Sequence, residues 1–424
     1  MDNHKIKERQ QQRYQKAQLR RSKQKRRRRI LLITALSVLL LAGILLLVLL
    51  LRKDSPTPDQ PPSTPPTASA DEETVIHLAF AGDVNVTNKV VEAGYTPAGY
   101  DYSDIFQDIL PALADADNTV VNFEGNLCGP PYGSVDTKAP MELAQALSRS
   151  GVDMLQIANS YSINNGMIGL EQTLSGVRQA GMEPLGAYAS PEEAENSGGF
   201  TLRSIHGVKV AFVAFTKGMD NMSLPIGKET CVNVLYEDYT STYQTVNTEG
   251  ITQVLERVAA AQPDVTVALL HWGSEYNSQV SDSQKKIVTL MQENGVDAII
   301  GTHSHYVQEI DYDPQTGALV AYSLGDLLGD GDKSRTGYSI VLNLEVTKNQ
   351  TTGAARVTDF SYTPVYIYNQ ENEDGDLSTR LVRIPSAIAE YEANGITKVS
   401  EEAYQDMISA QSRLNKLLES SNAS

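Results

Sequence analysis

The chain contains little cysteine and little histidine, and beyond residue 53 it contains little positive charge. Of its 424 residues, only 2 are Cys and 6 are His. Cys128 and Cys231 are too few to form a cluster of thiolate metal ligands. An exported location would permit a disulfide between them, but two cysteines so far apart in the sequence are equally compatible with free thiols.

Positive charge is concentrated at the N-terminus. Residues 1–29 contain 13 Lys and Arg and two acidic residues, which gives a net charge of +11. From Asp54 onward, 20 basic residues are outnumbered by 50 acidic residues, which gives a net charge of −30. Because affinity for nucleic-acid phosphates requires clustered Lys and Arg, we expect no nucleic-acid partner for this acidic part.

The basic tail precedes an uncharged apolar run of 22 residues, 30–51. A helix of this length spans roughly 33 Å, about the thickness of a bilayer's hydrocarbon core. Arg26–Arg29 before the run predict a cytoplasmic N-terminus and an extracellular C-terminal part. We therefore expect one transmembrane helix, a signal-anchor, in a single-pass protein of the cell membrane. The alternative is a signal peptide cleaved after Ala68-Ser69-Ala70, although the run is longer than such peptides usually have.

Composition divides the rest of the chain into three parts. Residues 52–73 are rich in Pro, Ser and Thr and bury too little apolar surface to fold, so we expect an extended linker. Residues 74–370 carry the pattern of a folded domain. Residues 371–424 form a C-terminal extension, for which we expect a helix over 400–418.

Short apolar runs alternate with stretches of helical spacing, which predicts the α/β class. Strands are expected at 75–81, 119–123, 154–158, 265–270, 298–300 and 319–324, and helices at 141–150, 166–180, 248–261 and 281–294. Residues 202–215 and 338–367 each have the pattern of a β-hairpin. This combination indicates a sandwich of two sheets with helices.

Nearly every predicted strand is followed by a side chain that can bind a metal ion. These side chains are Asp83, Glu124, Asn159, His271, His303, His305 and Asp326. Because the carboxyl ends of strands in α/β sheets form the ligand crevice, we expect them to converge on one site. His303 and His305 would face that site together if their loop were extended, since residues i and i+2 of a strand point the same way.

Each of these residues also has a structural interpretation. Gly82-Asp83 alone is typical of a turn, His271 alone of a hydrogen-bonded core histidine, and the carboxylates alone of helix caps. Three of the six histidines, however, follow predicted strands. Carboxylates and imidazoles without thiolates suit one or two divalent ions such as Mn²⁺, Fe²⁺ or Zn²⁺, which support metal-assisted hydrolysis.

Six motifs follow one another along the chain: GDVN (82–85), NFEG (122–125), IANSYSINNG (157–166), HWGSEY (271–276), GTHSH (301–305) and YSLGD (322–326). Their order resembles the CapA family of bacterial capsule, or poly-γ-glutamate, synthesis proteins. The resemblance implies a four-layer α/β/β/α sandwich of metallophosphatase type. It also implies a surface protein acting in synthesis, export or attachment of an anionic polymer, with polymer synthase subunits and the polymer as partners.

Two segments depart from the family pattern. One is YSLGD (322–326), where the family commonly has YSLGN, so that Asp326 supplies a carboxylate. Where the family commonly has ANNHxxDxG, this chain has Ser160, Tyr161 and Asn164 in place of the second Asn, the His and the Asp. In related phosphoesterases that Asn binds metal and that His protonates the leaving group. The resemblance therefore places Tyr161 at the position of the proton donor. Its reference pKa is near 10, which is further from neutral pH than that of His. His271 is the second candidate catalytic residue.

Three functions remain open at this point. The first is a membrane-anchored hydrolase of the cell surface with one or two metal ions. The second is a scaffold of the same fold that binds polymer or partner proteins without hydrolysis, an interpretation motivated by the altered 159–164 segment. The third is an extracellular module that binds small ligands. A domain of net charge −30 repels an anionic polymer at long range, so polymer binding is expected from the resemblance alone.

Overall fold

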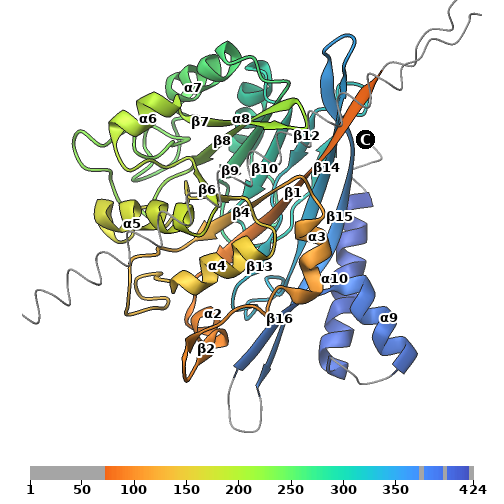
Figure 1. Cartoon of the computed structure of the whole chain (residues 1–424). Coiled ribbons are helices and arrows are strands. Elements are labelled where there is room, and N and C mark those ends of the chain that lie inside the picture. Colours follow the sequence, from red (N-terminus) through yellow and green to blue (C-terminus); the bar gives the residue numbers. More distant parts are fainter. Residues whose placement is uncertain (1–71, 372–376, 395–398, 420–424) are drawn as a thin grey trace, which may run out of the picture. The chain divides into compact units, whose positions relative to one another are not determined.

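The computed structural model describes residues 72–371, 377–394 and 399–419 (Figure 1). The predicted basic tail, the predicted transmembrane helix and nearly all of the predicted linker lie outside the described residues. Within the described ranges, no helix combines the length and the apolar character needed to cross a membrane.

The first sheet joins a parallel half to an antiparallel half through the long strand β1 (Glu73–Asn85). On one side of β1 the parallel strands are β4 (Asn118–Glu124), β5 (Met154–Gln156) and β6 (Glu183–Leu185). On the other side the antiparallel strands are β14 (Tyr338–Asn349), β15 (Ala355–Glu371) and β16 (Leu377–Arg383). The short strand β13 (Asp326–Leu328) pairs in parallel with the end of β1.

The second sheet has the order β11-β12-β10-β9-β8-β7. Its parallel strands are β12 (Leu319–Ala321), β10 (Ala298–Thr302), β9 (Val265–His271) and β8 (Val208–Thr216). The edge strands β11 (Ile310–Tyr312) and β7 (Phe200–Ile205) are antiparallel to their neighbours. A separate ribbon pairs β2 (Tyr95–Thr96) with β3 (Gly99–Tyr100).

The alternation of apolar side chains along β8 shows how the layers are packed. Val210, Phe212 and Ala214 belong to the larger core cluster, which also contains residues of the first sheet. The side chains between them, Ala211, Val213 and Phe215, pack with the helices α7 (Thr248–Ala260) and α8 (Asp282–Glu293). Because successive residues of a strand point to opposite faces, the second sheet lies between the first sheet and these two helices.

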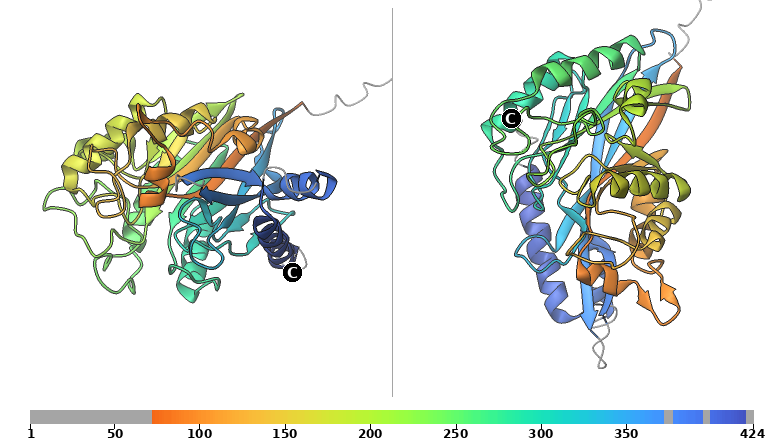
Figure 2. Two further views of the ribbon diagram at one scale, coloured as in Figure 1. Left: turned by 90° about the horizontal axis from the view of Figure 1, so that it is seen from below. Right: turned by 90° about the vertical axis from the view of Figure 1, so that its left-hand side faces the viewer.

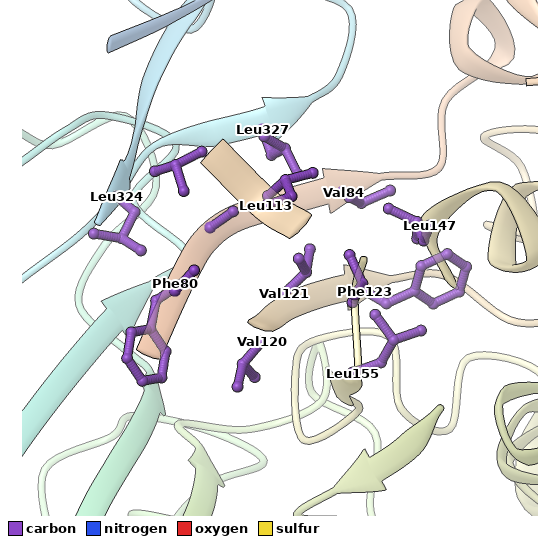
Figure 3. Close-up of a cluster of buried hydrophobic side chains, with 14 of the residues drawn as sticks. Phe80, Val84, Leu113, Val120, Val121, Phe123, Leu147, Leu155, Leu324 and Leu327 are labelled. Carbon is purple, nitrogen blue, oxygen red and sulfur yellow. The ribbon is translucent and has the colours of Figure 1, made fainter. Parts of the chain in front are cut away.

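The other large helices cover the first sheet. The chain forms α4 (Met141–Arg149) and α5 (Gly166–Gln179) between the parallel strands of this sheet (Figure 1). Figure 3 shows Leu147 of α4 beside Phe123 of β4, and both side chains are fully buried. The shorter helices are α2 (Asn88–Ala93), η1 (Gln107–Ile109), α3 (Leu110–Ala114) and α6 (Pro191–Ser197). The expected α/β class is confirmed.

The C-terminal segment adds to the antiparallel half of the first sheet. Strand β16 pairs with β15, and the helices α9 (Ile384–Asn394) and α10 (Glu401–Glu419) contact β15 (Figures 1 and 2). Met407 and Leu414 lie on the same face of α10, two turns apart, and both are buried. The helix expected over 400–418 is thus present.

Most expected elements are present with boundaries shifted by a few residues, but the strand expected at 319–324 is wrong in its second half. It ends at Ala321 in the second sheet, and the chain then crosses to the first sheet, where Asp326 begins β13. The sequence analysis also missed the strands β6 and β16, which pair at the edges of the first sheet. Cys128 is half-buried and Cys231 is buried, and both are free thiols.

Gly82 allows β1 to approach the crossing segment closely. A Cβ atom at residue 82 would lie 1.8 Å from the carbonyl oxygen of Gly325. The missing side chain leaves room for the backbone N–H of Asp83 to donate to that oxygen at 3.0 Å. Asp83 and Asp326 are register partners in this pairing. The lack of a side chain at residue 82 therefore allows the carboxylates of Asp83 and Asp326 to lie next to each other.

We predict that Gly82→Ala destabilises the protein by about 1–3 kcal/mol, because the added methyl group overlaps backbone that cannot rotate away. The measurement is the free energy of urea-induced unfolding. Gly337→Ala is the control, since a Cβ there would have no neighbour closer than 3.7 Å. Equal stability of the two variants would contradict the close approach.

Candidate metal centre

Six buried side chains form two neighbouring groups of potential metal ligands. One group contains Glu124, His271 and His303, and the other contains Asp83, His305 and Asp326. Within each group, the potential ligand atoms all lie within 4.8 Å of one another. Six of the seven predicted ligands therefore come together in space.

The ligands come from both sheets. Asp83, Glu124 and Asp326 lie at the ends of β1 and β4 and at the start of β13, in the first sheet. His271 ends β9 in the second sheet, and His303 and His305 lie in the bend after β10. The backbone N–H of His303 donates to Oδ2 of Asp83 at 3.0 Å, which ties the two sheets together at the centre.

The bend that carries the two histidines is not extended. His303 and His305 have φ angles of 88° and 58°, a region that non-glycine residues rarely adopt. Both histidines do lie at the candidate centre, but the predicted reason, alternation along an extended strand, is wrong. Their ring centroids are 6.2 Å apart, and each histidine belongs to a different group. Strained backbone of this kind is characteristic of functional sites.

Asn159 lies beneath the centre and is held by other contacts. Its amide nitrogen donates to the carbonyl oxygen of Phe123 at 2.7 Å and to Oδ1 of Asn122 at 3.1 Å. Its own Oδ1 accepts the backbone N–H of Tyr161 at 3.0 Å. These bonds orient the side chain and leave the second lone pair of Oδ1 free, so the role of Asn159 as a ligand stays a prediction.

Two further asparagines contact the ligands and were missed in the sequence analysis. The amide nitrogen of Asn122 donates to Oδ1 of Asp83 at 2.6 Å, and that of Asn85 donates to Oδ1 of Asp326 at 3.0 Å. Both asparagines are two residues away from a predicted ligand in the same strand. The period of two along a strand is the signal that identifies them.

Electrostatics show how strongly the carboxylates are crowded. Burial, together with the charge of Asp326, raises the pKa of Asp83 to about 7. Burial and the charge of Asp83 raise the pKa of Glu124 well above its usual value. Burial alone would lower the pKa of His305, but its hydrogen bond to Asp326 (2.8 Å) and the nearby carboxylates raise it to about 11.

His271 and His303 behave in the opposite way. Burial lowers the pKa of both imidazoles well below the ordinary value, and neighbouring positive charge lowers it further. The contact of 3.4 Å between His271 and Glu124 is therefore not an ion pair, because the imidazole is neutral. A neutral, fully buried imidazole suits a metal ligand better than a proton donor.

The donor set fits divalent cations. Three carboxylates are buried together, and burying unpaired charge is costly. Divalent cations would supply the positive charge that the crowded carboxylates need. Oxygen and imidazole ligands without thiolates suit Mn²⁺, Fe²⁺ or Zn²⁺.

A cleft of about 400 Å³ leads to this centre. Among its lining residues are the ligands Glu124, His305 and Asp326, together with Tyr161 and Glu275. Burial, and then the charges of Glu124 and Glu275, raise the pKa of Tyr161 above its usual value, so its hydroxyl stays protonated at neutral pH. The ring of Tyr276 stacks on that of His305 at the same wall, with centroids 5.0 Å apart.

The fold and the centre together define an α/β protein with a candidate site for divalent metal ions. Residues 77–331 match the family described as bacterial capsule synthesis protein PGA_cap, which is more than half of the chain. The chain therefore belongs to this family, and the resemblance noted from the motifs is confirmed.

Two curated Bacillus proteins are similar over most of their length. The PGA biosynthesis protein CapA of Bacillus subtilis is 25% identical over 310 residues, which are 70% of this chain and 73% of that protein. The capsule biosynthesis protein CapA of Bacillus anthracis is 24% identical over 293 residues, which are 66% of each chain.

Solved structures of phosphoesterases are more distant. The calcineurin-like phosphoesterase YfkN from Bacillus subtilis is 16% identical with a TM-score of 0.41, and the match covers 82% of this chain and 98% of that one. A phosphatase from Mycoplasma pneumoniae is 12% identical with a TM-score of 0.42, and the match covers 70% and 95%.

We predict that the protein binds one or two equivalents of Mn, Fe or Zn, and that His303→Ala/His305→Ala weakens binding by about 100-fold or more. The double variant removes one ligand from each group. Elemental analysis after reconstitution and dialysis measures the metal content.

His206→Ala is the matched control for this experiment. His206 is exposed on a hairpin turn, where its ring contacts Asp117, and it belongs to neither group of ligands. A wild-type protein without metal, or a double variant that retains it fully, would contradict the metal assignment.

Proposed function

We propose that the protein is a metal-dependent hydrolase of the cell surface that acts on phosphoester or acyl bonds in the synthesis, export or attachment of a capsule-type anionic polymer. The observation that carries this proposal is the pair of buried ligand groups beside one cleft. Membership of the capsule synthesis family supports the biological setting. The fold proposed is the four-layer sandwich of metallophosphatase type.

The ligand groups would hold one or two metal ions. Metal ions bound there would polarise a phosphoryl or acyl oxygen and lower the pKa of a bound water, which is the chemistry of metal-assisted hydrolysis. The chain's own contribution is a fixed, buried set of ligands. Asn122 and Asn85 hold the carboxylates Asp83 and Asp326 by hydrogen bonds, so the ligands are positioned before substrate arrives.

Tyr161 is the proposed proton donor to the leaving group. It lines the cleft beside Glu124, and its raised pKa keeps the hydroxyl protonated at neutral pH. In hydrolysis the bond to the leaving oxygen breaks as water adds, and that oxygen takes a proton. A phenol this weakly acidic donates less readily than an imidazolium. We therefore expect slow turnover.

The second candidate function is a scaffold of the same fold without hydrolysis. Ser160, where the family pattern has asparagine, uses its hydroxyl to contact Nε2 of His271 at 3.1 Å. A hydroxyl engaged with a neighbouring ligand is a poor metal ligand in its own right. This contact favours the scaffold, and the activity of variants at 160 and 161 separates the two functions.

The proposal includes anchoring in the cell membrane by residues 30–51, with the N-terminus in the cytoplasm and the acidic domain outside. The proposed partners are the membrane, subunits of a surface-polymer synthase and the anionic polymer. Nucleic acid is not a proposed partner, because the net charge after residue 53 is −30.

We predict that metal-loaded protein hydrolyses an alkyl phosphodiester, whose alkoxide leaving group needs a proton, and that Tyr161→Phe lowers kcat by about 100-fold, because general-acid catalysis is lost. Release of the alcohol measures the rate. Tyr306→Phe is the control, since Tyr306 also lies beside Tyr276 but does not line the cleft.

A second variant distinguishes the hydrolase from the scaffold. If the wild-type protein is inactive with metal bound, while Ser160→Asn/Tyr161→His gains phosphoesterase activity, the chain is a scaffold that has lost the reaction. If Tyr161→Phe retains the full wild-type rate, Tyr161 is not the acid.

A further inference from the structure

Lys217 contacts the candidate metal centre from the side of the second sheet. It directly follows β8, and its backbone N–H donates to the carbonyl oxygen of His271 at 2.7 Å. Its Nζ lies 3.3 Å from Nε2 of His303 and donates to the carbonyl oxygen of Gly273 at 2.9 Å. The same Nζ lies 4.5 Å from the centroid of the Tyr243 ring.

The ammonium group of Lys217 has no carboxylate partner within 4.0 Å in the part of the chain that the structure describes. Two other lysines that are largely buried do have one: Lys348 pairs with Asp264 at 2.7 Å, and Lys138 pairs with Asp136 at 3.0 Å. The carbonyl oxygen of Gly273 and the face of the Tyr243 ring hold Lys217 in place, and the carboxylate of Glu275 acts on it electrostatically without forming an ion pair. Its positive charge is therefore available to a bound anion.

The charge of the loaded centre favours the same conclusion. The two groups contain three carboxylates, and Glu275 lines the same cleft, so these four carboxylates would balance two divalent cations before Lys217 is counted. Lys217 then adds one excess positive charge in contact with the ligand His303. An anion bound at the centre would neutralise this excess positive charge. It would also accept hydrogen bonds from the ammonium group of Lys217.

We propose that Lys217 binds an oxyanion of the substrate, a phosphoryl or carboxyl group, at the metal centre, and so selects for anionic substrates. This inference rests on the proposed metal-dependent function. Lys217 is then a specificity-determining residue that the sequence motifs do not include. In a domain of net charge −30, one unpaired ammonium beside the metals gives local attraction where the long-range field repels anions.

The test is calorimetric binding of inorganic phosphate, and separately of acetate, to the metal-loaded protein. Lys217→Gln keeps a hydrogen-bond donor for the carbonyl oxygen of Gly273 but removes the charge. We expect Lys217→Gln to weaken binding of at least one of the two anions by about tenfold or more. Lys217→Arg, which keeps the charge on a larger group, should weaken binding less than Lys217→Gln does. Weaker binding of phosphate alone would identify a phosphoryl group as the ligand of Lys217, and weaker binding of acetate alone would identify a carboxyl group.

Lys286→Gln is the matched control, because it removes one positive charge from an exposed position on α8. Metal content and the midpoint of thermal unfolding are measured for every variant. If Lys217→Gln, with its metal content intact, binds both anions as tightly as the wild type does, the inference is overturned while the metal site stands. If wild-type protein binds no metal, the proposed function fails and this inference fails with it.

Discussion

The close approach of β1 and β13 is the constraint on which the candidate centre depends. Gly82 lets the N–H of Asp83 reach the carbonyl oxygen of Gly325, and that pairing sets Asp83 opposite Asp326. Two carboxylates are thereby buried side by side, which is unfavourable without positive charge. His305 supplies part of that charge through its hydrogen bond to Asp326. The approach of these two strands therefore creates a local need for positive charge at the candidate centre.

The position of the centre at the junction of two sheets gives it two different halves. Glu124 is grouped with the neutral imidazoles of His271 and His303, whereas Asp83 and Asp326 are grouped with His305, whose pKa is raised. The two groups thus differ in charge although each contains carboxylate and histidine. Two metal ions bound there would meet unlike environments. This asymmetry arises because one group combines one carboxylate with two imidazoles, whereas the other combines two carboxylates with one imidazole.

The segment 159–164 shows why a motif is not a sufficient guide to a role. Asn159 keeps the family residue, yet both ends of its side chain bond to Asn122, to Tyr161 and to backbone. Ser160 departs from the family residue, yet its hydroxyl contacts the ligand His271. The identity of a residue fixes which bonds it can make, and the neighbours in the fold decide which bonds it does make.

Several features could be predicted because they depend on short stretches of sequence. Apolar runs ending in Asp83, Glu124 and His271 are strands in the structure, since burial on both faces requires continuous apolar sequence. The expectation for 319–324 was wrong because an apolar run does not reveal that the chain changes sheets within it. Lys217 was missed because nothing near it in the sequence marks it, and its partner His303 is 86 residues away.

The sequence by itself determined the α/β class, the family and the set of carboxylates and histidines that follow the strands, because local periodicity and motif order carry this information. Only the tertiary structure decided which ligands share a group, which asparagines support them and which lysine contacts the ligand His303. These properties depend on distances between segments far apart in the chain. The left-handed backbone of His303 and His305, which sends the two rings to different groups, is set by packing between the sheets and not by their sequence spacing.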